Sequence, residues 1–186
     1  MNHPCQALSD LLTIQEKKRR LKGIKIAYVG DGNNVTNSLI EAAAKMGMTI
    51  AVGCPPGYQP DRGIVDRARE EARQTGAVIE IGADPFVAVK DADVVYTDVW
   101  ISMGQEREQA KRLKILAPYQ LNARLLKCAK PDALVMHCLP AHRGEEISAE
   151  VLDGPQSVVF DQAENRLHMQ KAILVRLLGK KPARST

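Results

Sequence analysis

The sequence predicts an α/β fold in which a parallel sheet of about five strands is flanked by helices. From Lys25 onward, short runs of β-branched residues alternate with stretches of helix-forming composition, a pattern typical of a parallel sheet covered by helices. The chain has 186 residues, of which 45% are hydrophobic, so it can bury one sizeable core within the usual single-domain range. We therefore expect a Rossmann-like domain with three layers.

The expected strands are six β-branched runs, at residues 26–29, 49–52, 78–81, 94–97, 133–136 and 158–160. Helix-forming composition occupies residues 38–45, 64–74, 106–116 and 148–152, and glycines stand near the helix ends at positions 47, 76 and 154. The two end segments, 4–20 and 163–178, are expected to form further helices. Because they flank the sheet in sequence, either could pack against another partner.

Composition argues against several classes of protein. The 26 Lys and Arg residues exceed the 22 Asp and Glu residues only slightly, and the basic run at 17–20 has no interleaved aromatic residues, which favours a solvated helix end over a nucleic-acid patch. The four cysteines form no CxxC pair, so a zinc site or a disulfide framework is not expected. Without a long apolar run or a signal-peptide core, we expect a soluble, cytoplasmic protein with reduced thiols.

Unusual residues gather where the predicted strands end. The first strand runs into residues 30–34 (Gly-Asp-Gly-Asn-Asn), the fourth into residues 98–104, and the fifth into His137-Cys138-Leu139-Pro140. Ligands of open parallel sheets bind beyond the carboxyl ends of the strands. We therefore expect three polar loops to converge on one cleft, with the Cys138 thiol in it.

The first loop resembles a dinucleotide-binding turn only in part. Val35 stands where the third glycine of the fingerprint would be, and the end of the second strand offers no acidic residue for a ribose. Both absences argue against a nicotinamide cofactor. Asn34 is expected to cap the next helix, to bind the carboxylate or amine of an amino acid, or to do both.

Asp98 follows an apolar strand and could hold a ligand ammonium group, while Ser102 and the backbone after it could bind a carboxylate. Helix capping explains the same loop equally well. Cys138 could be a buried, inert thiol, and His137 a core histidine with satisfied hydrogen bonds. Only their joint placement at strand ends favours a site.

The two end segments carry weaker signals. His3 and Gln6 are three residues apart, so they can share one face of the first helical turn, where a helix N-terminus favours an anion. Arg166 could bind an anion with two nitrogens, although a surface arginine is the commoner case.

Taken together, these motifs resemble the ornithine carbamoyltransferase family. Five blocks carry the resemblance, and they span nearly the whole chain in the family's order: His3-Pro4-Cys5-Gln6, the loop at 30–34, residues 98–104 with Ser102-Met103-Gly104, His137-Cys138-Leu139-Pro140, and residues 161–166. The resemblance implies transfer of a carbamoyl group from carbamoyl phosphate to the δ-amine of ornithine, which gives citrulline and phosphate in arginine metabolism. It implies no metal or organic cofactor.

The resemblance also implies roles for individual residues. Those that would contact carbamoyl phosphate are His3, Gln6, Cys138, Leu139 and Arg166, and those that would hold ornithine are Asn34, Asp98, Ser102 and Met103. Cys138 resembles the active-site residue near the attacking amine, and its part in proton transfer stays open. Residues 1–20 would be an inter-domain helix with the His-Pro-Cys-Gln motif, and residues 21–186 an ornithine-binding domain that ends in a helix.

This sequence departs from the family pattern in one respect. The family has an amino-terminal carbamoyl-phosphate domain with a Ser-Thr-Arg-Thr motif, and that motif does not occur here. We therefore expect little or no transferase activity from this chain alone, and the family's homotrimer is not expected to form readily. The alternatives are a non-catalytic amino-acid-binding domain and, less favoured, a nicotinamide-dependent dehydrogenase domain.

Overall fold

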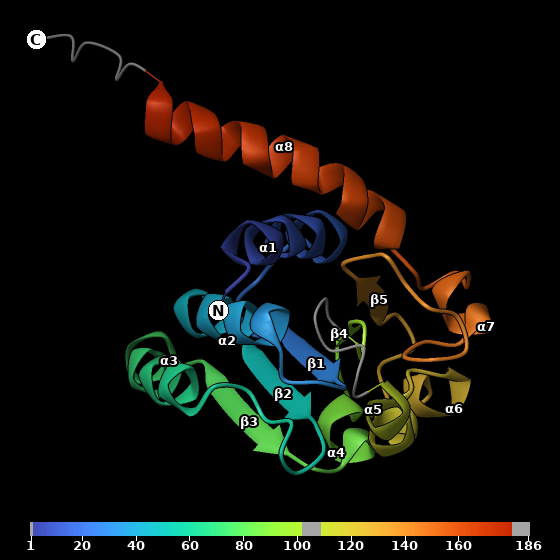
Figure 1. Ribbon diagram of the computed structural model, residues 1–186. Helices are drawn as coiled ribbons and strands as arrows, with labels where there is room; N and C mark the ends of the chain where they lie inside the picture. Colours follow the sequence, from blue (N-terminus) through green and yellow to red (C-terminus); the bar gives the residue numbers. More distant parts are fainter. Residues whose placement is uncertain (1, 102–108, 180–186) are drawn as a thin grey trace, which may run out of the picture.

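A computed structural model describes residues 2–101 and 109–179 of the chain, and its centre is a parallel sheet of five strands (Figure 1). The strands are β1 (Lys25–Val29), β2 (Thr49–Gly53), β3 (Val78–Gly82), β4 (Val94–Thr97) and β5 (Leu134–His137). Their order across the sheet is β3-β2-β1-β4-β5, and every neighbouring pair is parallel. The predicted fold class is therefore confirmed.

Strands β1 and β4 are buried on both faces, and their successive side chains point to opposite sides, whereas the edge strand β3 has one exposed face. In β1, Ile26 and Tyr28 join the core on one face, whereas Ala27 and Val29 join the core on the other. β4 follows the same alternation, with Tyr96 on the first face and Val95 on the second. Continuous apolar strands of this kind need a helical layer on each side.

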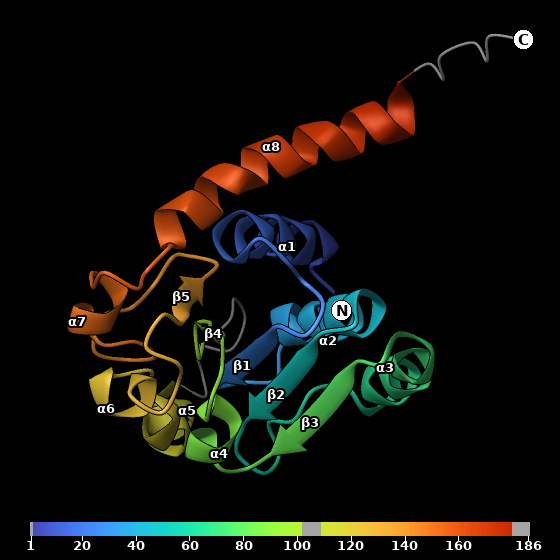
Figure 2. The same ribbon diagram turned by 180° about the vertical axis from the view of Figure 1, so that it is seen from behind.

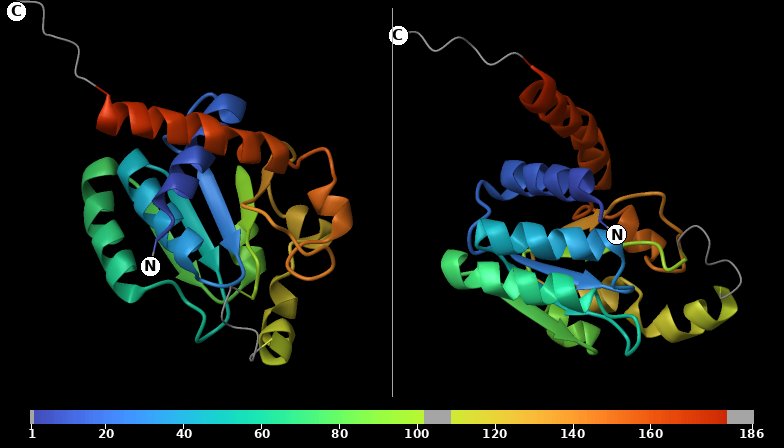
Figure 3. Two further views of the ribbon diagram at one scale, coloured as in Figure 1. Left: turned by 45° about the horizontal axis from the view of Figure 1, so that its top comes forward. Right: turned by 60° about the vertical axis from the view of Figure 1, so that its left-hand side comes forward.

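The helices supply those two layers (Figures 1 and 3). Helices α1, α2 and α3 contribute to the core on one face, and α4, α6 and α7 contribute to the core on the other. Their bounds are α1 (Pro4–Lys18), α2 (Asn34–Met46), α3 (Arg62–Thr75), α4 (Pro85–Val89), α5 (Gln109–Leu116), the short 3-10 helix η2 (Ala117–Tyr119), α6 (Ala123–Leu126), α7 (Ala149–Leu152) and α8 (Val159–Leu178).

The first and last helices lie side by side, although they come from opposite ends of the chain. α1 packs against both α2 and α8, and the two views in Figures 1 and 2 show α8 crossing over α1 and continuing past it. The apolar side chains Leu174, Val175, Leu177 and Leu178 are exposed on the far part of α8. The α1–α8 contact brings residues near position 6 close to residues near position 166.

Local caps set several helix ends. Asn33 caps α2, since its side-chain oxygen accepts hydrogen bonds from the backbone N–H groups of Val35 and Thr36 at 2.9 and 3.2 Å. The prediction that Asn34 is the cap was therefore wrong by one residue, and Asn34 is the first helical residue. Gly47 and Gly76 end α2 and α3 with φ of 65° and 79°, a left-handed backbone that glycine adopts without steric cost.

The sixth predicted strand is wrong. Ser157 makes only an isolated bridge to Val135 of β5, and α8 begins at Val159. The β-branched composition is overruled because Val159, Gln162 and Asn165 are buried at a helical spacing while Phe160 is 77% exposed. The short helices α4 and α6 were not predicted, and residues 106–108 of the predicted 106–116 helix lie outside the described residues.

Candidate functional site

The order of the strands creates a switch point between β1 and β4. The chain builds β1, β2 and β3 in one direction, then returns to place β4 on the other side of β1. Loops that leave β1 and β4 therefore diverge at the carboxyl edge of the sheet, which is where open α/β sheets bind ligands. The loop after β5 lies next to them.

Asp98 links these three loops. Its Oδ2 accepts a hydrogen bond from Asn33 Nδ2 at 2.6 Å, and its Oδ1 accepts one from Cys138 Sγ at 2.9 Å. The carboxylate is only 5% exposed. The convergence of the three strand-end loops, expected from the sequence, is thus present among the described residues.

The Cys138 thiol is held in its protonated form. Burial raises its pKa far above the usual value, and the neighbouring Asp98 charge and the hydrogen bond to that carboxylate raise it further. A thiolate is the nucleophilic form of cysteine. At neutral pH, Cys138 is therefore a polar side chain that lines the site and donates a hydrogen bond, and it is not a nucleophile.

His137 is a core histidine with both ring nitrogens engaged. Its Nδ1 accepts the backbone N–H of Leu139 at 2.9 Å, so the ring hydrogen is assigned to Nε2, which lies 3.1 Å from Glu146 Oε1. Burial alone would raise the pKa of Glu146, but hydrogen bonds from His137 and from the backbone of His142 outweigh burial and lower it. This arrangement fixes the turn at Leu139, whose φ is 60°.

One group of possible metal ligands coincides with the site. Asp98, His137 and Cys138 bring one ligand atom each within 4.8 Å of the others. A metal ion there would have to displace a hydrogen bond from a histidine nitrogen, because both nitrogens are engaged, and would have to deprotonate the thiol. The arrangement therefore suits hydrogen bonding to a ligand better than it suits a metal.

The residues predicted to bind an anion meet beside this group. Arg166 of α8 donates a hydrogen bond from Nη1 to Gln6 Oε1 of α1. The backbone N–H of His3 donates to Ser38 Oγ at 2.7 Å. Burial lowers the pKa of the His3 imidazole and the charge of Arg166 lowers it further, while Asp98 opposes both effects. His3 therefore lies within the electrostatic range of both charged groups.

The remaining predicted residues have different outcomes. Asn34 is half-buried at the start of α2, next to the asparagine that bonds Asp98, and Leu139 is half-buried beside Cys138. Ser102 and Met103 lie outside the described residues. The structure thus gathers on neighbouring elements His3, Gln6, Asn34, Asp98, Cys138, Leu139 and Arg166.

Sequence reasoning missed a buried ion pair that supports the loops. Arg112 of α5 donates from Nη2 to Asp31 and from Nε to the carbonyl oxygen of Trp100 at 2.7 Å, and its guanidinium lies 4.9 Å from the ring centroid of Tyr58. These contacts join the loops after β1 and β4 to α5. An arginine inside a helical segment carries no sequence signal for such a role.

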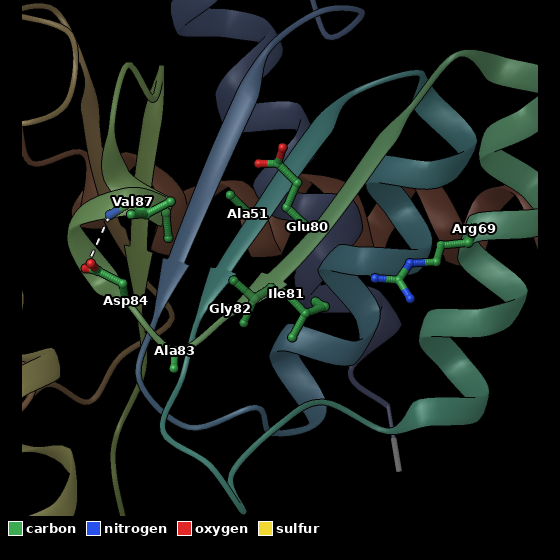
Figure 4. Close-up of a pocket in the computed structure, with 10 residues that line it drawn as sticks. Ala51, Arg69, Glu80, Ile81, Gly82, Ala83, Asp84 and Val87 are labelled. Carbon is green, nitrogen blue, oxygen red and sulfur yellow. Dashed lines mark hydrogen bonds between the residues drawn. The ribbon is translucent and has the colours of Figure 1, made fainter.

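A cavity of about 490 Å³ lies elsewhere, along β2, β3 and α4 (Figure 4). Its lining includes Ala51, Glu80, Gly82, Asp84 and Val87, and it contains none of the residues predicted for the site. Asp84 is engaged in capping α4 through the backbone N–H groups of Phe86 and Val87. We therefore place the candidate site at the strand ends, where polar side chains converge.

Comparison with known proteins identifies the family to which the chain belongs. The family described as aspartate/ornithine carbamoyltransferase, Asp/Orn binding domain, matches residues 22–177. Ornithine carbamoyltransferase of Geobacillus stearothermophilus is 60% identical over 177 residues, which are 95% of this chain and 57% of the relative, and that of Syntrophus aciditrophicus is 62% identical over 172 residues, 92% of this chain and 56% of the relative.

Solved structures give the same result. Ornithine carbamoyltransferase from Pyrococcus furiosus superposes with a TM-score of 0.94 at 55% identity, over 98% of this chain and 58% of that one. The chain spans a little over half the length of the relatives it matches. No helix in the described part of the chain combines the length and the apolar character that a membrane span requires. From its sequence and fold, the chain belongs to the aspartate/ornithine carbamoyltransferase family and contains that family's Asp/Orn-binding domain.

Proposed function

We propose that this chain is the ornithine-binding part of an ornithine carbamoyltransferase. The reaction would join carbamoyl phosphate and L-ornithine to give L-citrulline and phosphate, in the biosynthesis of arginine. The observation that carries the proposal is the Asp98 carboxylate, which is hydrogen-bonded to Asn33 and Cys138 at the switch point of the sheet. A buried carboxylate with thiol and amide neighbours suits a substrate that carries ammonium groups.

The proposed ornithine contacts are Asn34, Asp98, Ser102 and Met103. Asp98 offers the negative charge that an ammonium group requires, and Asn34 offers both a donor and an acceptor. An amine with a lysine-like pKa of about 10 must lose a proton before it attacks a carbonyl carbon. The site must therefore stabilise the neutral δ-amine, and a protonated Cys138 adds no negative charge that would oppose this.

The proposed carbamoyl-phosphate contacts are His3, Gln6, Cys138, Leu139 and Arg166. Arg166 supplies a permanent positive charge for the phosphate. His3, whose pKa is lowered, would be neutral at pH 7 and could donate a hydrogen bond to the carbamoyl oxygen. The Cys138 thiol and the Leu139 backbone would line the same side of the ligand, with Cys138 as the active-site residue near the attacking amine.

We further propose that residues 1–20 form an inter-domain helix and residues 21–186 the ornithine-binding domain, and that the protein works in the cytoplasm. Its small-molecule partners would be ornithine and carbamoyl phosphate. The family's homotrimer is not proposed for this chain by itself.

Citrulline production tests the transferase proposal. We expect the purified 186-residue chain to make little citrulline, because the residues of the family's Ser-Thr-Arg-Thr motif are absent from it. Calorimetric titration with L-ornithine, with and without carbamoyl phosphate, should detect ornithine binding that Asp98→Asn abolishes and that Asp93→Asn retains. Normal turnover by this chain would overturn the expected inactivity. If Asp98→Asn binds ornithine as tightly as the wild-type chain does, the assigned site is overturned.

A further inference from the structure

Asp10 of α1 is a fully buried carboxylate that lies between the Gln6–Arg166 pair and the loop that contains Cys138. Its Oδ1 accepts hydrogen bonds from Gln6 Nε2 at 2.8 Å and from Gln162 Nε2 at 2.7 Å. Its Oδ2 accepts a hydrogen bond from the Tyr96 hydroxyl at 3.1 Å. Burying a carboxylate is costly even when it is hydrogen-bonded. The position therefore calls for a reason beyond filling the core.

The carboxylate determines which way two amide groups point. A glutamine amide has one donor end and one acceptor end, and the hydrogen-bond network decides their orientation. Because Oδ1 of Asp10 accepts hydrogen bonds from both side chains, both glutamines must turn their NH₂ groups toward it. Their oxygens then face away, in two different directions.

Each outward oxygen reaches one part of the site. Gln6 Oε1 accepts the hydrogen bond from the Arg166 guanidinium. Gln162 Oε1 accepts the backbone N–H of His137 at 3.0 Å, directly before Cys138. Asp10 is therefore hydrogen-bonded neither to Arg166 nor to the loop that contains Cys138, but it connects the two through Gln6 and Gln162.

We propose that Asp10 is a positioning residue, which aligns the Arg166 guanidinium and the His137–Leu139 turn by fixing the amide orientation of Gln6 and Gln162. Its importance for carbamoyl transfer rests on the proposed function. The alignment itself is a property of this chain and can be measured without turnover.

The alignment should not depend on the charge of Asp10. A proton on Oδ2 can be donated to the Tyr96 oxygen, and Oδ1 still accepts both amides. Asparagine at this position can do the same, with its oxygen toward the glutamines and its NH₂ group toward Tyr96. Leucine has a similar size and offers no acceptor at all.

The test compares Asp10→Leu with Asp10→Asn. The first readout is the rate at which iodoacetamide alkylates Cys138, followed by peptide mass spectrometry so that the other cysteines do not interfere. The second is the NMR chemical shift of the Arg166 guanidinium. Asp93→Leu is the matched control, because Asp93 is a buried carboxylate at the amino end of β4, bonded to Lys130 and to the backbone of Lys25.

We expect Asp10→Leu to change the Cys138 rate roughly fivefold or more, the factor that corresponds to one lost hydrogen bond, and to move the Arg166 resonance. Asp10→Asn should keep the alkylation rate and the Arg166 chemical shift near their wild-type values. Asp93→Leu should lower thermal stability and leave that rate and that shift unchanged. If Asp10→Leu retains both values, the proposal is overturned.

If Asp10→Leu does not fold, two variants that each remove one of the two glutamine amides test the proposal instead. Gln162→Leu should change the Cys138 rate and spare the Arg166 resonance, whereas Gln6→Leu should do the reverse. A wild-type Cys138 rate in Gln162→Leu contradicts the proposal, as does a large change of that rate in Asp10→Asn. Loss of ornithine binding, by contrast, would concern the proposed function and not this alignment.

Discussion

The Cys138 thiol shows how a few neighbouring atoms decide what a residue can do. A cysteine after an apolar strand can be inert, reactive or a ligand contact, and the sequence leaves these alternatives open. In the structure, the thiol donates to Asp98 and its pKa is raised by burial and by that carboxylate. Its chemistry is therefore that of a neutral donor, set by a residue 40 positions away in sequence.

At this scale, we expect Asp98→Asn to lower the pKa of Cys138. Removing the negative charge of Asp98 removes one of the effects that disfavour the thiolate, while burial and the charge of Asp10 remain. The pH profile of Cys138 alkylation should therefore shift to lower pH. Cys54, whose pKa is raised to about 11 mainly by burial, is the internal control and should not shift. An unchanged Cys138 profile would count against the Asp98 contact.

Asp10 should also make stability depend on pH. Burial raises its pKa from 3.8 to about 7 against the opposing hydrogen bonds. Between these two values the folded state holds a proton that the unfolded state has released, so the free energy of unfolding falls as pH rises. At about 1.4 kcal/mol per pKa unit, the total change is a few kcal/mol.

Asp10→Asn should abolish this contribution. Urea unfolding at pH 4.5 and pH 8 should show that the variant gains stability relative to wild type at the higher pH. Comparing the two proteins cancels the other titrating groups they share. An equal difference at both pH values would mean that Asp10 does not titrate in this window.

At the scale of elements, the site depends on contacts between helices and loops that are distant in sequence. α5 is held against the loop after β1 by the Arg112–Asp31 ion pair, and both side chains are nearly buried. The charges are 81 residues apart. Arg112 also donates to the carbonyl oxygen of Trp100, so the same side chain holds the residues directly after Asp98.

We expect Arg112→Met to destabilise the protein by about 3–5 kcal/mol, because it leaves the Asp31 carboxylate buried without its partner. The double variant Arg112→Met with Asp31→Asn should recover part of the loss, since the uncompensated charge is gone. Arg124→Met is the control: Arg124 is exposed and lies over the Phe86 ring, so its loss should cost little. Chemical denaturation measures all three, and equal losses for Arg112→Met and Arg124→Met would refute the expectation.

At the scale of the whole molecule, the β3-β2-β1-β4-β5 order turns separate motifs into one site. It places the loops after β1, β4 and β5 along one edge, and the α1–α8 contact adds Gln6 and Arg166, which are 160 residues apart. Alternating apolar strands and helical segments predict the layers, but their spacing contains no information on which strand lies beside which. In this order the helices cover both faces of the central strands.

The sequence by itself determined the α/β class, the approximate positions of the five strands and the family resemblance, because strand and helix patterns and motif order are local properties. It misread residues 158–160 as a strand, since three β-branched or aromatic residues cannot reveal that a helix will bury Val159, Gln162 and Asn165 on one face. Only the tertiary structure decided that Asn33 caps α2 and bonds Asp98, and that Asp10 joins Gln6 to Gln162. These contacts link residues whose separation is set by the packing of the whole chain, and local composition does not encode such distances.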